Sequence, residues 1–464
     1  MDRIKLSKEN LIEIVSGVID KTKMEFYYQS ALEDKIEANR HIELVVFLVT
    51  LVRYFYENLF VLKGINPYMF FNLKEIKDNK EYWDFYELLR KTNLEIAYSL
   101  INDETSDDKL LVGFSEVQSL FYFISNNYLS CLLTCNNAIY RDNKNSLCNF
   151  LKASIIEICY INKISQNTKI ALLNYQFELL SKCKVDEIQF DKKIFNKMFK
   201  NVIERRQKLS TSEKEIKLTK CFDDSVLTDE SIFYLKNRLF LNPLNNYGNF
   251  LDAVFEDMET LLISDKNKKM FDEIVEDYKF CRNKLYQYFE EKSINKREMS
   301  SIYSYTYSIF DKIAFVIKKE FDLNVDDDKV GFTQNGLFDC KFNKFDKAFS
   351  SLCNNNIVPL YLIMKQVREK QKISNALMVG TFELNELRNA IGHKSLLLVD
   401  ESKLKRNSIE LLSKARDAIL YSFMLLYSID RNFNNDSISC IFTTYIEALD
   451  DMAKQKRVIS NAKI

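Results

Sequence analysis

The stretch SNALMVGTFELNELRNAIGHKS, residues 374–395, decides how the second half of this 464-residue chain is interpreted. Its large aliphatic residues follow helical spacing, with steps of 7, 3 and 4 residues along Leu377, Leu384, Leu387 and Ile391. Such a stripe is typical of the buried face of an amphipathic helix. Ser374 is a suitable N-cap and Gly392 is placed to end the helix, so the pattern predicts a helix over residues 374–392.

Three polar residues lie off this stripe, near the C-terminal end of the predicted helix: Arg388, Asn389 and His393. Asn389 and His393 are four residues apart and therefore share one face of a helix, with Arg388 beside them. Their side chains can thus enter one groove. A histidine at a helix C-terminus also has a purely structural explanation, because its cation is favoured at that end of the helix dipole.

The composition predicts an all-α fold. The chain contains only 8 glycines and 3 prolines, which are the main helix breakers and turn formers. That scarcity favours long helices with short connections and argues against all-β and doubly wound α/β folds, which need more turn residues. Hydrophobic residues make up 47% of the chain, and 464 residues are too many for one ordinary core. More than one domain is therefore expected.

A polar, charged stretch poor in large apolar residues separates the two halves, and residues 206–232 are predicted to be the junction. Residues 1–205 are predicted to form a helical N-terminal domain, which would serve as a sensor, a regulator or a scaffold. Its clearest helix follows the apolar spacing of residues 42–52. Residues 233–435 are predicted to form a helical bundle, followed by a helical tail over residues 436–464.

The second half contains several candidate helices and one long loop. Residues 322–342 include two glycines and the run Asp326–Asp328, and they are predicted to be a surface loop. A calcium loop would need alternating ligands and a distal glutamate, which this stretch lacks. The candidate helices cover residues 252–263, 268–292, 300–321, 344–353, 360–369, 374–392 and 405–431.

Charge and cysteine content argue against several classes of protein. Lysine plus arginine and aspartate plus glutamate both total 66, so the net charge gives no general attraction to nucleic acid. Ten cysteines without a CxxC pair and two histidines supply no familiar zinc set, so no metal or other cofactor is expected. The unpatterned cysteines, the charged N-terminus and an apolar run no longer than residues 42–52 predict a cytoplasmic protein that does not enter the membrane.

The set of Arg388, Asn389 and His393 suits cleavage of RNA by its own ribose 2′-hydroxyl. Such cleavage needs a base for the hydroxyl proton, an acid for the leaving 5′-oxygen and positive charge on the phosphorane-like transition state. Histidine transfers protons near neutrality, the arginine fork matches phosphate oxygens, and asparagine can orient the histidine or bind a phosphate oxygen. One histidine in each set supplies only one proton-transfer group, and a two-fold dimer would bring two copies together.

The sequence RNAIGH resembles the signature of the HEPN superfamily (higher eukaryotes and prokaryotes nucleotide-binding), which is an arginine, often followed by a polar residue, and a histidine a few residues later. Four residues separate Arg388 from His393 here. The resemblance covers about residues 235–430. Three further blocks resemble a bacterial HEPN subfamily: FLNPLNNYGNFLDAVFED at residues 240–257, VEDYKFCRNKLYQY at 275–288 and SYTYSIFDKIAFVIKKEFDL at 304–323.

The resemblance implies an all-α bundle that dimerises with its signature helices facing each other. It implies a metal-independent endoribonuclease, often a toxin or an anti-phage, abortive-infection effector, with Arg388 and His393 catalytic and Asn389 supporting. The implied partners are an RNA substrate such as tRNA or rRNA, a second copy of the chain, and an antitoxin or other regulatory protein. Some relatives are AMPylated on a tyrosine two residues after the histidine; Ser395 stands there, so this regulation is not expected. The alternative is a non-catalytic HEPN module for dimerisation or nucleotide binding.

Three charged residues are further candidates for a supporting role in the site. Lys394 directly follows the histidine, and Asp311 and Lys312 lie in an otherwise apolar predicted helix. Asp311 and Lys312 either form a structural ion pair or line the active groove.

Residues 189–220 carry ten lysines and arginines against four acidic residues, with phenylalanines among them. One interpretation is a track for the RNA backbone with stacking aromatic rings, in which Lys200, Arg205 and Arg206 bind RNA. The other is a helix with an apolar phenylalanine stripe and a solvated face.

Overall fold

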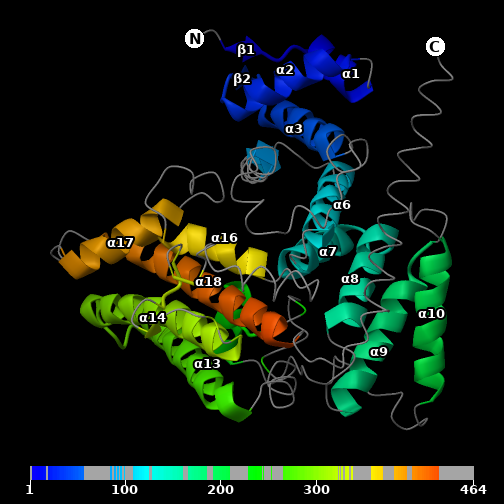
Figure 1. Ribbon diagram of the computed structural model, residues 1–464. Coiled ribbons are helices and arrows are strands. Elements are labelled where there is room, and N and C mark those ends of the chain that lie inside the picture. Colours follow the sequence, from blue (N-terminus) through cyan, green and yellow to red (C-terminus); the bar gives the residue numbers. More distant parts are fainter. Residues whose placement is uncertain are drawn as a thin grey trace.

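The computed structural model confirms the all-α fold (Figure 1). The strands among the described residues, β1 (Ile4–Lys5) and β2 (Ile36–Glu37), are two residues long and pair in parallel. None of the helices that the structure describes is both long and apolar enough to cross a bilayer. The structure describes residues 3–16, 19–56, 84–85, 88–89, 91–92, 95–96, 99, 108–124, 128–159, 166–184, 192–208, 228–242, 244, 252, 265–321, 323, 326–327, 330–333, 336–337, 357–368, 381–393 and 400–427.

The helices of the first half pack in succession along the chain. They are α1 (Lys8–Ser16), α2 (Lys21–Leu32), α3 (His41–Tyr56), α6 (Asp108–Ile124), α7 (Tyr128–Arg141), α8 (Ser146–Cys159), α9 (Gln166–Ser181) and α10 (Lys192–Gln207). Helix α3 contacts α6, and each helix from α6 to α10 contacts the next one in the chain. Cys131 and Cys135 of α7 are fully buried, so these two cysteines are core residues of this half.

The helices of the second half form a bundle around α18 (Glu401–Tyr427). The others are α11 (Asp229–Lys236), α13 (Asp265–Tyr286), the π-helical turn η5 (Gln287–Glu291), α14 (Lys296–Glu320), α16 (Ile357–Arg368) and α17 (Thr381–His393). Helix α18 packs against α13, α14, α16 and α17, while α11 packs against α13. Figure 1 shows α13 and α14 below α18, with α16 and α17 above it.

The helices predicted for residues 268–292, 300–321, 360–369, 374–392 and 405–431 correspond to α13 with η5, α14, α16, α17 and α18. Their ends differ by a few residues, apart from the start of α17, before which residues 369–380 lie outside the described part of the chain. The predicted helix over residues 344–353, the tail over 436–464 and most of the junction also lie outside the described residues.

Helix α14 packs against α13, α17 and α18 and supplies several buried aromatic residues of the bundle. It begins with a capping box, in which the Asn295 side chain accepts from the Glu298 backbone N–H at 3.0 Å and the Glu298 carboxylate accepts from the Asn295 N–H at 2.8 Å. These two bonds satisfy backbone donors that a helix start leaves unpaired. The helix then buries Tyr303, Tyr307 and Phe310 along one side.

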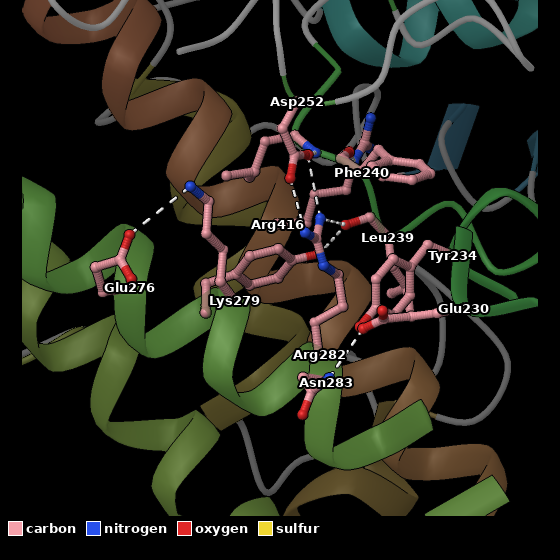
Figure 2. A network of polar contacts seen from close by, with 12 residues as sticks. Glu230, Tyr234, Leu239, Phe240, Asp252, Glu276, Lys279, Arg282, Asn283 and Arg416 are labelled. Atoms are coloured by element: carbon pink, nitrogen blue, oxygen red, sulfur yellow. Dashed lines mark hydrogen bonds and ion pairs between the residues drawn. The ribbon is translucent and has the colours of Figure 1, made fainter. Parts of the chain in front are cut away.

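Arg282 of α13 joins Leu239 and Asp252 to the bundle (Figure 2). Its guanidinium donates to the two carboxylate oxygens of Asp252 at 3.1 and 2.7 Å and to the carbonyl oxygen of Leu239 at 3.1 Å. Burial alone would lower the pKa of Arg282, but Asp252 more than offsets this effect, and the pKa lies above its ordinary value. The pair is therefore a charged, buried link between α13 and the preceding segment.

Arg416 of α18 adds a second link to the same segment. It donates to the carbonyl oxygens of Phe240 at 2.8 Å and Asn242 at 3.1 Å. Carbonyl oxygens outside regular structure need partners when they are buried, and the arginine fork supplies several donors at once. The central helix of the bundle thus holds the segment that follows α11.

The two halves meet at the C-terminal end of α18. Tyr421 of α18 is buried and forms a hydrogen bond with Ser130 of α7. Burial raises the pKa of the Tyr421 hydroxyl well above its ordinary value, so this group is a neutral hydrogen-bonding partner at physiological pH.

Candidate functional site

Helix α17 places its apolar residues inward and Arg388 and Asn389 outward, as the spacing predicts. Leu384 and Leu387 are buried, and Ile391 is partly buried against the core. Arg388 and Asn389 are exposed. Both side chains are therefore available to a ligand on the open side of α17.

Arg388 lies over an aromatic ring of α14. Its guanidinium carbon is 4.9 Å from the centre of the Tyr307 ring, which is within the range of a cation–π contact. The Tyr307 side chain is only 2% exposed, so the ring is a buried, fixed surface beneath the exposed guanidinium. This contact orients an otherwise exposed arginine.

A second arginine contacts the same ring. The guanidinium carbon of Arg368, the last residue of α16, is 5.2 Å from the centre of the Tyr307 ring. One nitrogen of Arg368 donates to both carboxylate oxygens of Asp311, at 2.8 and 2.9 Å. The Arg368 side chain is 9% exposed and that of Asp311 is 46% exposed, so the pair runs from the interior to the surface.

Asp311 also holds a loop. The backbone N–H of Phe332 donates to its carboxylate at 3.1 Å, and the Phe332 ring lies 5.4 Å from that of Phe310. Asp311 is thus a structural ion-pair partner of Arg368, beside the Arg388 site.

Lys312 faces a different helix. It donates to Asp277 of α13 at 2.6 Å and also pairs with Glu273. Burial would lower the pKa of Lys312, but the hydrogen bonds to Asp277 and Glu273 outweigh burial and raise the pKa above its usual range. The two neighbours Asp311 and Lys312 therefore take partners on different helices, α16 and α13.

His393 is the last residue of α17. Its side chain and the whole of Lys394 lie outside the described residues, so their predicted roles stay predictions.

The buried tyrosines of α14 do not transfer protons near neutrality. Burial raises the pKa of Tyr307 to about 12, although Arg368 and Arg388 act in the opposite direction. Burial likewise raises the pKa of Tyr303 well above its usual range. Both hydroxyls stay protonated at physiological pH and serve as hydrogen-bond donors.

The candidate RNA-binding arginines of α10 are engaged within the first half. Arg205 donates to both carboxylate oxygens of Glu157 of α8, at 2.7 and 3.0 Å. Arg206 donates to the Asn174 side chain at 2.9 Å and stacks 4.0 Å from the centre of the Phe177 ring, so it attaches α10 to α9. These contacts give both arginines a packing role.

The rest of this basic helix divides into two faces. Phe195 is buried, and Phe199 packs against Phe177 with ring centres 5.6 Å apart. Lys200 is 76% exposed and lies 3.8 Å from Glu204. The described part of α10 thus has an apolar phenylalanine stripe and a solvated basic face.

Asp327, in the predicted loop, pairs with Lys318 and Lys319 at the end of α14. Among the residues with described positions, no three or more histidine, cysteine, aspartate or glutamate side chains are grouped so as to hold a metal ion.

Sequence reasoning did not select Tyr307 and Arg368. Both lie inside helices that the periodicity predicts. Tyr307 also lies in the block at residues 304–323 that resembles a HEPN subfamily, but nothing in that block distinguishes it from its neighbours as a site residue. The available signal was a spacing of four residues along α14, from Tyr303 to Tyr307 to Asp311, which places these side chains on one face.

Comparison with known proteins identifies the region that contains this site. Residues 289–428 match the family model described as LA2681-like HEPN. The matched residues contain the C-terminal part of η5 and all of α14, α16, α17 and α18, together with Arg388 and His393. The resemblance to the HEPN superfamily is thereby confirmed for this region, which is a nuclease or nucleotide-binding module in general terms. No curated protein and no solved structure matches the chain.

Proposed function

We propose that the protein is a metal-independent endoribonuclease whose catalytic residues are Arg388 and His393, with Asn389 supporting them. One observation carries the proposal: Arg388 is exposed on the helix that ends at His393, inside the HEPN region. An arginine in this position can meet a phosphate without first losing a buried partner. The adjacent exposed Asn389 adds a neutral hydrogen-bonding group on the same side.

In the proposed reaction the ribose 2′-oxygen attacks the neighbouring phosphorus and the bond to the 5′-oxygen breaks. A base takes the 2′-hydroxyl proton, and an acid gives a proton to the leaving 5′-oxygen. The products are a 2′,3′-cyclic phosphate and a 5′-hydroxyl. His393 acts as the base or the acid, and Arg388 stabilises the negative charge on the transition state.

We infer that the active form is a homodimer, because each chain contributes one histidine to this set and the reaction needs two proton transfers. The substrate would be a cellular RNA such as tRNA or rRNA. The biological setting would be that of a toxin or an anti-phage, abortive-infection effector in the cytoplasm. The N-terminal half would sense a trigger or restrain the nuclease, alone or with an antitoxin or other regulatory partner.

The test is cleavage of total tRNA and rRNA by the purified full-length protein in the presence of EDTA. Wild type is compared with Arg388→Ala and His393→Ala, and with Lys403→Ala as a control for loss of an exposed basic residue in the same region. Cleavage should be lost in the first two variants and kept in the third. Cleavage that survives in both site variants, or that EDTA abolishes, contradicts the proposal.

The alternative is a non-catalytic HEPN module for dimerisation or nucleotide binding, which the family match supports equally well. Expression in a bacterial host separates the two functions. A toxic wild type beside a harmless His393→Ala variant favours the nuclease. Equal growth, together with nucleotide binding that Arg388→Ala weakens, favours the binding module.

A further inference from the structure

The orientation of Arg388 depends on the Tyr307 ring that lies beneath it. Arg388 has a long, exposed side chain, and a phosphate-binding group must be held in its productive geometry to contribute fully to catalysis. The contact that the structure describes for its guanidinium is the face of the Tyr307 ring, at 4.9 Å. The position of this ring therefore sets the position of the arginine.

The ring is fixed by contacts with two helices. The Tyr307 hydroxyl donates to the carbonyl oxygen of Val367, the residue before Arg368, at 3.4 Å. Tyr303, one turn earlier in α14 and 5.7 Å from Tyr307 between ring centres, donates to the carbonyl oxygen of Leu384 at 2.8 Å. Leu384 lies one turn before Arg388. Helix α14 thus aligns both arginines with one ring.

Arg368 is held too firmly to serve as a ligand-binding group itself. Its side chain is 9% exposed, and it is bound by both oxygens of Asp311. Asp311 is anchored from the other side by the Phe332 N–H at 3.1 Å. Two cations approach the Tyr307 ring, and the Asp311 carboxylate neutralises the inner one.

We propose that Asp311, Arg368 and Tyr307 are positioning residues that fix the orientation of Arg388 toward a phosphate of the RNA substrate. This inference rests on the proposed ribonuclease function. Asp311 compensates the charge of Arg368, Arg368 supports the Tyr307 ring, and the ring carries Arg388. Each residue acts through the next one, and none of the three needs to touch the substrate.

The decisive variant is Asp311→Asn, which keeps the shape of the side chain and removes its charge. Arg368 then becomes an uncompensated cation on the ring that Arg388 uses, and the two like charges repel each other. Misplacement of Arg388 should lower kcat by about 10- to 100-fold. KM should not rise, because the site gains net positive charge and still attracts the RNA backbone. If the pair only joined α14 to α16, the folded protein would keep its full kcat.

A spectroscopic measurement tests the positioning without relying on cleavage. In full-length protein labelled with [13C,15N]arginine, the δ-proton signal of Arg388 is identified as the one missing from Arg388→Lys. A ring face shifts this signal upfield. The shift should disappear in Tyr307→Leu and shrink in Asp311→Asn. It should stay in Tyr307→Phe, which keeps the ring, and in Tyr305→Phe, a control on the opposite side of α14 whose hydroxyl bonds to Asp277.

The two readouts separate failure of this inference from failure of the proposed function. An upfield shift that persists in Tyr307→Leu or in Asp311→Asn overturns the inference, even if Arg388→Ala abolishes cleavage. A wild type that cleaves no RNA contradicts the function, while a ring-dependent shift still establishes the positioning. Only variants whose circular dichroism shows the helical content of the wild type are compared. If Asp311→Asn does not fold, Arg368→Lys replaces it, because lysine keeps the charge but not the two-oxygen pairing geometry.

Discussion

The buried link between Arg282 and Asp252 allows a sharp test of how the second half is held together. The two side chains are 9% and 12% exposed, so the value of about 0–1 kcal/mol for a surface ion pair does not apply. The replacement Asp252→Ala leaves the guanidinium buried without its counter-charge and also removes the acceptor of the Leu241 N–H, at 2.7 Å. Breaking a buried pair from one side costs about 3–5 kcal/mol.

The milder replacement Asp252→Asn keeps an acceptor for Leu241 but removes the charge. It should cost about 1.5–3 kcal/mol, the value of hydrogen bonds to a charged group. Glu276 provides a matched control (Figure 2). Its side chain is 73% exposed, and its carboxylate lies 3.7 Å from the Lys279 ammonium. Glu276→Ala should cost less than about 1 kcal/mol, because both groups of this pair are hydrated.

Hydrogen–deuterium exchange of the full-length protein measures this local stability, because a chain of several units does not unfold in one step. Amides of residues 239–242 should exchange about 100-fold faster or more in Asp252→Ala, since each factor of ten corresponds to about 1.4 kcal/mol. Asp252→Asn should lie between wild type and Asp252→Ala. If Asp252→Ala changes the exchange no more than Glu276→Ala does, the link does not hold the segment and the reasoning is refuted.

Three further predictions concern the site. Burial raises the pKa of Tyr307 from about 10 in the unfolded chain to about 12 in the folded protein. The protonated hydroxyl therefore contributes about 2–3 kcal/mol to stability below pH ~10, and this contribution is lost as the pH rises through ~12. The urea concentration at which the upfield-shifted Arg388 δ-proton signal disappears reports on this part of the chain alone, and its fall over this pH range should be smaller in Tyr307→Phe. A Cβ at Gly336 would lie 2.4 Å from the Gly331 carbonyl oxygen, whereas one at Gly331 would be 3.6 Å from its nearest neighbour. Gly336→Ala should therefore loosen this turn by about 1–3 kcal/mol, seen as faster proteolysis at Phe332, and Gly331→Ala should not. If two copies of His393 share one active site, an equal mixture with exchanged His393→Ala chains should keep roughly one quarter of wild-type cleavage, and one half would indicate independent sites.

The helices of the second half could be predicted because their signal is local. The apolar spacing of Leu384, Leu387 and Ile391 determines which side of α17 is buried, and this spacing also places Arg388 and Asn389 outside. The scarcity of glycine and proline predicts the all-α fold class for a similar reason, because each of these residues destabilises a helix only near its own position. Such features need no knowledge of which helix contacts which.

The contacts that shape the site could not be predicted, because they join residues far apart in the chain. Asp311 and Arg368 are 57 positions apart, and Asp252 and Arg282 are 30 apart. No periodicity links the members of either pair, and the chain contains 66 acidic and 66 basic residues from which pairs could form. The basic segment around α10 shows the same limit. From the sequence, the charges of Arg205 and Arg206 were compatible with RNA binding, but in the structure both side chains bond to residues of α8 and α9.

The neighbours Asp311 and Lys312 show how one short sequence serves two interfaces. Successive residues of a helix point about 100° apart, so Asp311 and Lys312 are directed toward different neighbouring helices. Positions four apart share a face, and Tyr303, Tyr307 and Asp311 accordingly line the side of α14 toward α16 and α17. Tyr305 and Lys312 line another side, where both bond to Asp277 of α13. The block SYTYSIFDK therefore carries two stripes at once, and only the first of them leads to Arg388.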